Sequence, residues 1–307
     1  MQNLRNDKPL FIHIGHYKCA STFFQRTFFP IHPEVELVTQ ETHPLFDDFL
    51  TCRDYDYDPQ KVRNYFQSSD KVRLISSENL IGDIYLTGLN GDLYARRLKD
   101  TFSDPTIIVI IRNQITMLES HFLQTVNGGG AGRMGVNDFI KTTRYNWQRM
   151  GFSWRYLEYY KNLRYYQNMF GKDKVILYLF EELKENPKAF LDRFCNDIGV
   201  STLENPPTAK RRPRHSPYTY FFMRAISRFR HGRFNMAGGM LDHFEPIPIG
   251  KIRQKLNYFY SLAPLLGKNH KYLSAQNRQA IIEHYREDNH RLQEYTGIDL
   301  AKYGYPL

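Results

Sequence analysis

Residues 10–25, Leu-Phe-Ile-His-Ile-Gly-His-Tyr-Lys-Cys-Ala-Ser-Thr-Phe-Phe-Gln, decide the fold of this chain. The segment predicts a buried strand over 10–14, a tight turn, and a helix over 21–29. Such a turn directs backbone N–H groups, the positive end of the helix and Lys18 at one point, which makes an anion site. The spacing differs from the G-x-x-x-x-G-K-[ST] loop of triphosphate-binding proteins, because Lys18 follows Gly15 by three residues and no second glycine is present.

The chain then alternates between helical and strand-like segments, which favours an α/β fold with a doubly wound parallel sheet. We expect further strands over 72–76, 106–111 and 175–180. The run T-I-I-V-I-I of 106–111 is apolar and β-branched, as is typical of a strand covered on both faces. A helix over 187–198, with Pro187 in its first turn, follows the fourth strand. Ligands of such sheets bind at the carboxyl ends of the strands.

The last third of the chain departs from this alternation. Residues 218–234 form a basic amphipathic stretch, and a turn-rich linker follows it. A final helix is predicted from Ser274, as its N-cap, to about Tyr295. We expect one domain over 1–307, within which 205–307 supplies a basic loop and a helical extension.

The composition is that of a folded globular protein of 307 residues, with 41% hydrophobic and 15% aromatic residues. Cys19, Cys52 and Cys195 lie far apart and lack C-x-x-C spacing, so we expect neither disulfides nor a metal site. No apolar run approaches the roughly 20 residues that span a bilayer, and the first residues lack the apolar core of a signal peptide. These features favour a cytoplasmic protein, although a trimmed lumenal protein would have the same sequence pattern.

The net charge of +10 is concentrated in one segment. Residues 205–241 hold eight Lys or Arg and no acidic residue, whereas the remainder has 34 basic and 32 acidic residues. We expect this segment to bind an anion, with a merely solvated face as the alternative. Nucleic acid is not an expected partner, because no recognised nucleic-acid module accompanies the charge. Contact of 218–234 with a membrane surface stays open.

A second anion site is predicted where the third strand ends. Arg112 follows the strand directly, and Ser120 lies eight residues later on the next helix. The guanidinium offers a planar fork and the serine a hydroxyl, a combination that suits a phosphate. An arginine paired with a carboxylate is the alternative.

Together these segments resemble the sulfotransferases that use 3′-phosphoadenosine 5′-phosphosulfate (PAPS). In that family a K-x-G-[ST]-[ST] loop binds the 5′ side of the donor, and an R-N-P-x-x-R-x-x-S-x-Y segment binds its 3′-phosphate. This chain has K-C-A-S-T over 18–22 and R-N-Q-I-T-M-L-E-S-H-F over 112–122, with alanine where the loop usually has glycine. Proline and the second arginine are replaced by Gln114 and Met117. Residues 175–200 and 285–300 resemble two further segments of the family.

The resemblance implies a role for each matching residue. Lys18 would stabilise the leaving phosphate, and Arg112 with Ser120 would hold the 3′-phosphate. The remaining donor-site residues would be the loop and helix-start residues together with arginines of the basic segment: Cys19, Ala20, Ser21, Thr22, Phe23 (stacked on adenine), Arg211 and Arg212.

Transfer to a hydroxyl also needs a group that takes the proton. Glu78, just past the second predicted strand, is our first candidate, because glycan- and tyrosine-directed members of the family use a glutamate in this region. A helix N-terminal acid with no catalytic part is the alternative. His16, His43 and His121 compete with it, since neutral histidine is a good base near pH 7.

The sequence thus predicts a sulfotransferase that moves a sulfuryl group from PAPS to a hydroxyl, on a carbohydrate or glycolipid, without a metal. One alternative is a nucleotide-dependent kinase of the same topology, which would need Mg²⁺ and a loop that this chain lacks. The other is a non-catalytic protein that binds polyanions through its basic segment.

Overall fold

The computed structural model describes residues 9–66, 68–84, 88–127, 135–140, 152–208, 222–226 and 272–307. The chain divides into two compact units. The first comprises Met1–Asn113, Arg155–Ala209 and Tyr285–Leu307, and the second comprises Gln114–Trp154 and Lys210–His284. The single domain expected over 1–307 stays a prediction.

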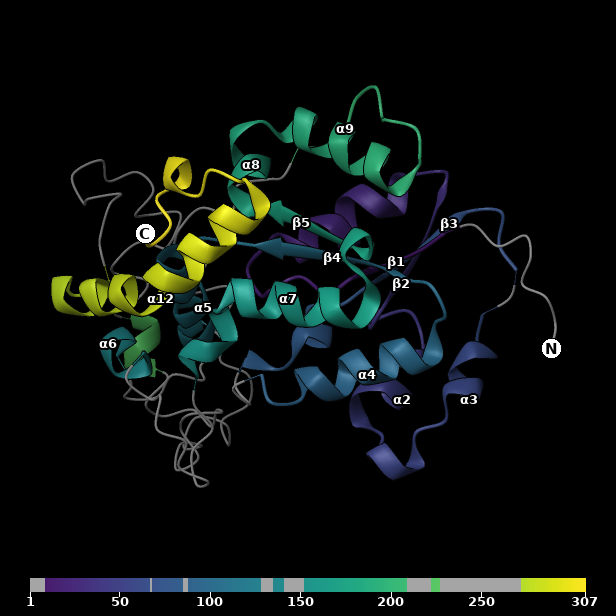
Figure 1. Cartoon of the computed structure of the whole chain (residues 1–307), viewed down its shortest axis with the longest axis horizontal. Helices are drawn as coiled ribbons and strands as arrows, with labels where there is room; N and C mark the ends of the chain where they lie inside the picture. Colours follow the sequence, from purple (N-terminus) through teal and green to yellow (C-terminus); the bar gives the residue numbers. More distant parts are fainter. Residues whose placement is uncertain are drawn as a thin grey trace. The chain divides into compact units, whose positions relative to one another are not determined.

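The first unit is built on a parallel sheet of five strands in the order β2-β3-β1-β4-β5 (Figure 1). The strands are β1 (Leu10–His13), β2 (Val35–Thr39), β3 (Val72–Ser76), β4 (Thr106–Ile111) and β5 (Val175–Leu179). The predicted doubly wound α/β fold is therefore confirmed. Four of the strands were predicted within one residue of these bounds, whereas the edge strand β2 was missed. Chain order reverses around β1, which pairs with both β3 and β4.

Helices cover both faces of this sheet. In Figure 1, α8 and α9 lie on one side of it and α4 and α7 on the other. The helices of the first unit are α1 (Ser21–Phe23), α2 (Leu45–Thr51), α3 (Pro59–Arg63), α4 (Gly91–Thr101), α7 (Tyr159–Phe170), α8 (Phe180–Glu185) and α9 (Pro187–Ile198). α9 begins as predicted, because Pro187 needs no donor there and the Asn186 side chain accepts the Ala189 N–H at 3.1 Å.

The predicted first helix differs from the observed one in its winding. After α1 the chain continues as a π-helix over Phe24–Phe28 and a 3₁₀ helix over Phe29–Ile31. The i to i+5 spacing of a π-helix brings Phe29 above Phe24, and their rings stack with centroids 5.5 Å apart. Both rings also pack on Phe194 of α9, at 5.5 and 5.4 Å. The π-helical winding of this segment therefore accompanies the packing of its aromatic rings on α9, whereas the sequence period alone predicted an α-helix.

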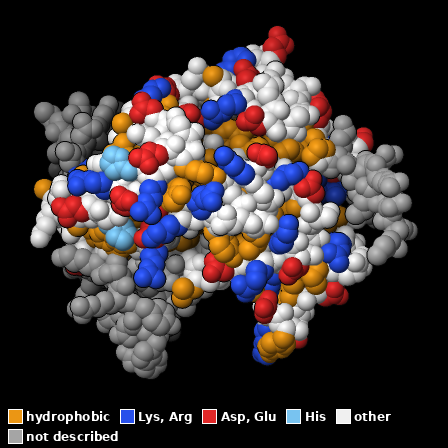
Figure 2. All heavy atoms as spheres, in the orientation of Figure 1, with side chains coloured by type: hydrophobic (Ala, Val, Ile, Leu, Met, Phe, Trp, Pro, Cys, Tyr) orange, Lys and Arg blue, Asp and Glu red, His pale blue; other side chains and the backbone are white. Residues whose placement is uncertain are grey.

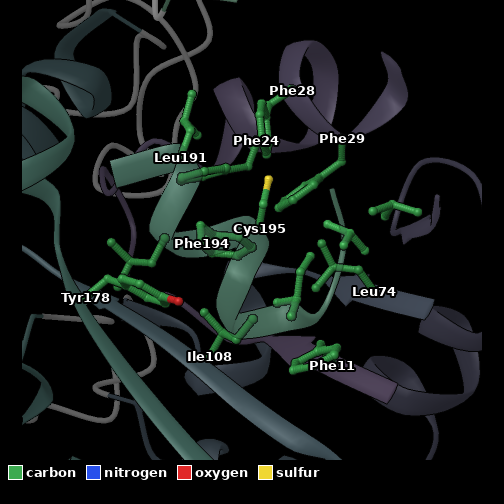
Figure 3. Close-up of a cluster of buried hydrophobic side chains, with 14 of the residues drawn as sticks. Phe11, Phe24, Phe28, Phe29, Leu74, Ile108, Tyr178, Leu191, Phe194 and Cys195 are labelled. Atoms are coloured by element: carbon green, nitrogen blue, oxygen red, sulfur yellow. The ribbon is translucent and has the colours of Figure 1, made fainter. Parts of the chain in front are cut away.

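These rings belong to the core between the sheet and α9 (Figure 3). Phe11, Leu74 and Ile108 contribute from three neighbouring strands, and all are buried. Each fully buried aromatic or branched side chain contributes about 1.5–3 kcal/mol through removal of apolar surface from water. This core fixes the helical segment of 21–31, and with it the loop that precedes Ser21.

The second unit is helical where it is described. It holds α5 (Gln114–Asn127), α6 (Val136–Phe139) and the first part of α12 (Ala275–Thr296). Ser274 is the predicted N-cap of α12, and its hydroxyl accepts the Asn277 N–H at 3.2 Å. The buried Glu119 of α5 pairs with Arg278 at 3.1 Å. Over the described residues, no helix is both long and apolar enough to cross a membrane.

Charges of both signs intermingle on the visible face of the described residues (Figure 2). The basic excess of the sequence falls in 205–241, most of which lies outside the described residues. The anion binding that we expected of this segment stays a prediction, and its contact with a membrane surface stays open.

The last part of α12 belongs to the first unit and caps a helix there. The buried Asp288 carboxylate accepts the N–H groups of Tyr160 and Lys161 at 2.9 and 3.4 Å, at the start of α7. The neighbouring Asn289 donates to the Pro306 carbonyl at 2.8 Å. Asp288 and Asn289, the D-N pair of the 285–300 segment, therefore fix the start of α7 and the C-terminal residues.

We expect Asp288 to make stability depend on pH. Burial raises its pKa from 3.8 to about 6, so the folded state binds a proton more readily than the unfolded state. The stabilisation from this proton is present below about pH 4 and is lost as the pH rises to about 6, by up to about 3 kcal/mol. Urea unfolding between pH 4 and 7 should show this loss in the wild type and in Asp173→Asn, an exposed control, but not in Asp288→Asn.

Candidate active site

The loop after β1 has the backbone geometry of an anion cradle. Lys18 and Ala20 both have left-handed backbones, with φ of 65° and 68°. Left-handed residues within a turn direct successive N–H groups into one concavity, which binds anions. Gly15 permits the entry to this turn, because a Cβ there would lie 2.5 Å from the His13 ring. Ser21 and Thr22 open the helical segment that follows, with Ser21 buried and Thr22 exposed.

The side chain of Arg112 reaches this loop from the end of β4. Its Nη1 donates to the Lys18 carbonyl at 3.0 Å, although the two residues are 94 positions apart. The guanidinium lies over the Phe180 ring, 4.8 Å from its centroid, and the Tyr159 hydroxyl donates to the Arg112 carbonyl at 2.7 Å. These contacts hold the two predicted anion-binding residues together at the carboxyl ends of β1 and β4.

Four charged groups act electrostatically on the Cys19 thiol. Burial raises the pKa of this thiol well above its usual range, and the charges of Arg112, Glu181, Glu78 and Lys18 also act on it. Two cations and two carboxylates are therefore gathered around one loop. The thiol itself stays protonated, so Cys19 offers the site its backbone and no nucleophile.

Glu181 and the C-terminal residues were not predicted as part of this region. The Glu181 carboxylate accepts the Asn113 N–H at 3.1 Å and the Tyr305 hydroxyl at 3.0 Å. The Asn113 side chain donates to the Gly304 carbonyl at 2.5 Å. These bonds fix the backbone beside Arg112. Glu181 belongs to the E-E-L part of the 175–200 segment, which resembles the family. That resemblance alone does not predict that its carboxylate lies beside Asn113.

Glu78 lies at the carboxyl end of β3, on the first turn of a 3₁₀ helix over Glu78–Ile81. The Gln25 amide donates to the Ser76 carbonyl at 3.1 Å and, at 3.5 Å, approaches the Glu78 carboxylate. A bond from the Tyr17 hydroxyl to the Asn79 side chain links the loop after β1 to the same turn. The half-buried Glu78 is therefore held beside the loop by neighbours from two elements.

The three histidines differ from Glu78 in their surroundings. Burial lowers the pKa of His16 to about 3, and its ring lies between Tyr156 and Tyr159, with centroids 5.1 and 4.9 Å away. A group with so low a pKa is a weak base near pH 7. The pKa of His43 is also lowered by burial, and its ring stacks on Phe66. His121 lies on α5 in the second unit.

The structure describes the positions of some of the other predicted donor-site residues but not of all. Phe23 is half-buried and packs on Phe24 and Phe28, with centroids 5.4 and 6.2 Å away, so its ring belongs largely to the core. Ser120 lies on α5 in the second unit, half-buried. Arg211 and Arg212 lie outside the described residues. Their assignment to the donor site, like the stacking of adenine on Phe23, stays a prediction.

The left-handed backbone at Ala20 explains why related loops have glycine there, and it predicts a stabilising substitution. An L-residue in this conformation is strained by roughly 1–2 kcal/mol, which glycine avoids at some cost in unfolded-state entropy. We expect Ala20→Gly to raise the free energy of unfolding by about 1 kcal/mol in urea titrations. The control Ala95→Gly, at a buried position inside α4, should lower it. A loss of stability in Ala20→Gly would contradict the strain.

This arrangement of strands has a counterpart among solved structures. A sulfotransferase from Alicyclobacillus acidocaldarius superposes with a TM-score of 0.60 over 97% of this chain and 99% of its own, at 15% identity. The chain has a sulfotransferase fold. The sulfotransferase domain of the Synechococcus PCC 7002 olefin synthase covers 84% of this chain and 96% of its own, with 13% identity and a TM-score of 0.41. No protein-family model and no curated protein matches the sequence.

Proposed function

We propose that this protein is a PAPS-dependent sulfotransferase. The observation that supports it most directly is the bond from Arg112 Nη1 to the Lys18 carbonyl, which joins the two anion-binding residues at one loop of a sulfotransferase fold. Cations fixed on two strand ends, together with a left-handed backbone, suit a ligand that carries several phosphate or sulfate groups.

In the proposed reaction, the acceptor hydroxyl oxygen forms a new bond to the sulfur of PAPS. The bond between this sulfur and the bridging oxygen of the 5′-phosphate breaks, and that oxygen keeps the electron pair. Glu78 takes the hydroxyl proton, and the products are a sulfate ester and adenosine 3′,5′-bisphosphate. Lys18 meets the charge that grows on the leaving oxygen, which a preorganised cation stabilises more than it stabilises the ground state. We propose a carbohydrate or glycolipid hydroxyl as the acceptor.

Calorimetric titration of adenosine 3′,5′-bisphosphate tests the donor site without an acceptor. We expect micromolar binding to the wild type that is unchanged by EDTA. Arg112→Ala should weaken it about 10–100-fold, the loss of one charged hydrogen-bond donor. Arg96→Ala, an exposed arginine on α4, should bind like the wild type.

Other results would favour other functions. Binding of ATP that requires Mg²⁺, with no affinity for the bisphosphate, would favour a kinase. Tight binding of heparin that persists in Arg112→Ala, again without nucleotide affinity, would favour a polyanion-binding protein. Absence of bisphosphate binding in folded wild-type protein would overturn the sulfotransferase proposal.

A further inference from the structure

A pocket of about 700 Å³ lies in the first unit, beside Glu78. Its lining comes from the helical segment after the donor loop, from β2 and the turn that follows it, and from the end of β3. The lining includes Arg26, Phe29, Pro30, Leu37, Glu41 and Glu78. Gln25 also approaches the Glu78 carboxylate, and Asn79 accepts the Tyr17 hydroxyl of the loop after β1 (the proposed donor loop), so pocket and loop adjoin at Glu78.

The pocket changes in character along its length. Val35, Leu37 and Thr39 alternate along β2 and therefore present one face of this strand to the pocket. Val35 is level with Val72, whereas Thr39 is level with Ser76, two residues before Glu78. The strand rises roughly 13 Å between these levels. Apolar walls thus lie away from Glu78, and hydroxyl and amide groups lie near it.

The charge of the lining disfavours acceptors that carry a negative charge. Among the lining residues the basic side chain is Arg26, and it is already paired with Glu41. The lining therefore holds one cation against two carboxylates, Glu41 and Glu78. An anionic group placed there would lose water and meet Glu78 with no spare cation, which is unfavourable.

We propose that this pocket binds the acceptor, and that the acceptor is an uncharged amphipathic alcohol. Its hydroxyl lies at the polar end beside Glu78, and its apolar body lies along the exposed Pro30 and the half-buried Leu37. This inference rests on the proposed function, because Glu78 needs an acceptor hydroxyl only if a group is transferred. It narrows the proposed carbohydrates and glycolipids to neutral ones and leaves out sulfated or uronic-acid polymers.

Two probes that differ in charge test the inference: octyl β-D-glucoside and octyl β-D-glucuronide, each below its micelle-forming concentration. Binding is measured by calorimetry on the full chain saturated with adenosine 3′,5′-bisphosphate. We expect the glucoside to bind at least about 10-fold more tightly than the glucuronide. Leu37→Phe, which fills the apolar wall, should weaken glucoside binding about 10-fold, whereas Ile31→Phe, an exposed position outside the lining, should not. Glu41→Gln, which releases Arg26, should strengthen glucuronide binding.

Bisphosphate affinity separates this inference from the function on which it rests. The pocket assignment is supported if the protein prefers the glucoside and Leu37→Phe weakens glucoside binding. The affinity for the bisphosphate should be unchanged in every variant. Three results would overturn the pocket assignment: glucuronide binding as tight as glucoside binding or tighter, glucoside binding that Leu37→Phe does not weaken, or no glucoside binding. If bisphosphate still binds, the proposed donor site is unaffected by these results. If folded wild-type protein binds no bisphosphate, both proposals fail.

Discussion

Replacing Lys18 with alanine is expected to lower turnover by about 10²–10³-fold, as the loss of a preorganised donor to a developing oxyanion does. In the proposed reaction the ammonium group lies where charge grows on the leaving oxygen, so its loss would affect the transition state more than the ground state. The measurement is the rate of sulfate transfer from PAPS to octyl β-D-glucoside at saturating concentrations. Binding of adenosine 3′,5′-bisphosphate should weaken less than turnover falls.

A matched lysine variant controls for the change in charge. Lys71 is exposed and precedes β3, at the amino end of the sheet, far along the strand from the donor loop. Lys71→Ala should therefore turn over at the wild-type rate. Near-normal turnover in Lys18→Ala would remove Lys18 from the chemical step, even if the protein still bound the bisphosphate.

The second large effect is expected at Glu78. Loss of a general base costs about 10²–10⁴-fold in rate. Glu78→Gln keeps the size of the side chain and its contact with Gln25 but cannot accept a proton, so turnover should fall by that amount. Bisphosphate affinity should stay within about twofold of the wild type, because the proton is taken from the acceptor and not from the donor.

The exposed Glu204 provides the comparison for this variant. Glu204→Gln should be fully active, since it changes the same charge away from the site. If Glu78→Gln retained wild-type turnover, the proton would have to go elsewhere. His16 would then be tested next, despite its lowered pKa, as the histidine nearest the donor loop in sequence.

Strands whose residues are buried on both faces could be predicted from the sequence. β4 is the clearest case, because T-I-I-V-I-I admits few other structures. β2 and β5 are the two edge strands of the described sheet and have the same pattern of buried residues, yet only β2 was missed, so its edge position is not the reason. Its sequence V-E-L-V-T includes Glu36, which pairs with Arg73 at 3.0 Å, and such a charge hides the strand pattern.

In the candidate site too, the positions of some residues could be predicted from the sequence and those of others could not. The proximity of Lys18 and Arg112 could be predicted, because each follows a strand that is itself easy to predict and parallel strands bring their carboxyl ends to one edge. Glu181 and Tyr305 could not, because they meet Asn113 through contacts between distant segments. The π-helical winding after Phe23 also depends on a distant partner, Phe194, which local periodicity does not reveal.

The central place of β1 in the sheet has a consequence for synthesis on the ribosome. Phe11 pairs with Leu74 and with Thr106, both of which are translated much later. At about 5–20 residues per second, roughly 5–20 s pass between Phe11 and Thr106. The nascent strand has both edges unpaired until β3 is translated and one edge unpaired until β4 follows, a state that is prone to aggregation. The donor loop therefore cannot assemble until roughly a third of the chain has emerged, and chaperones that shield apolar nascent segments should raise the yield of folded protein.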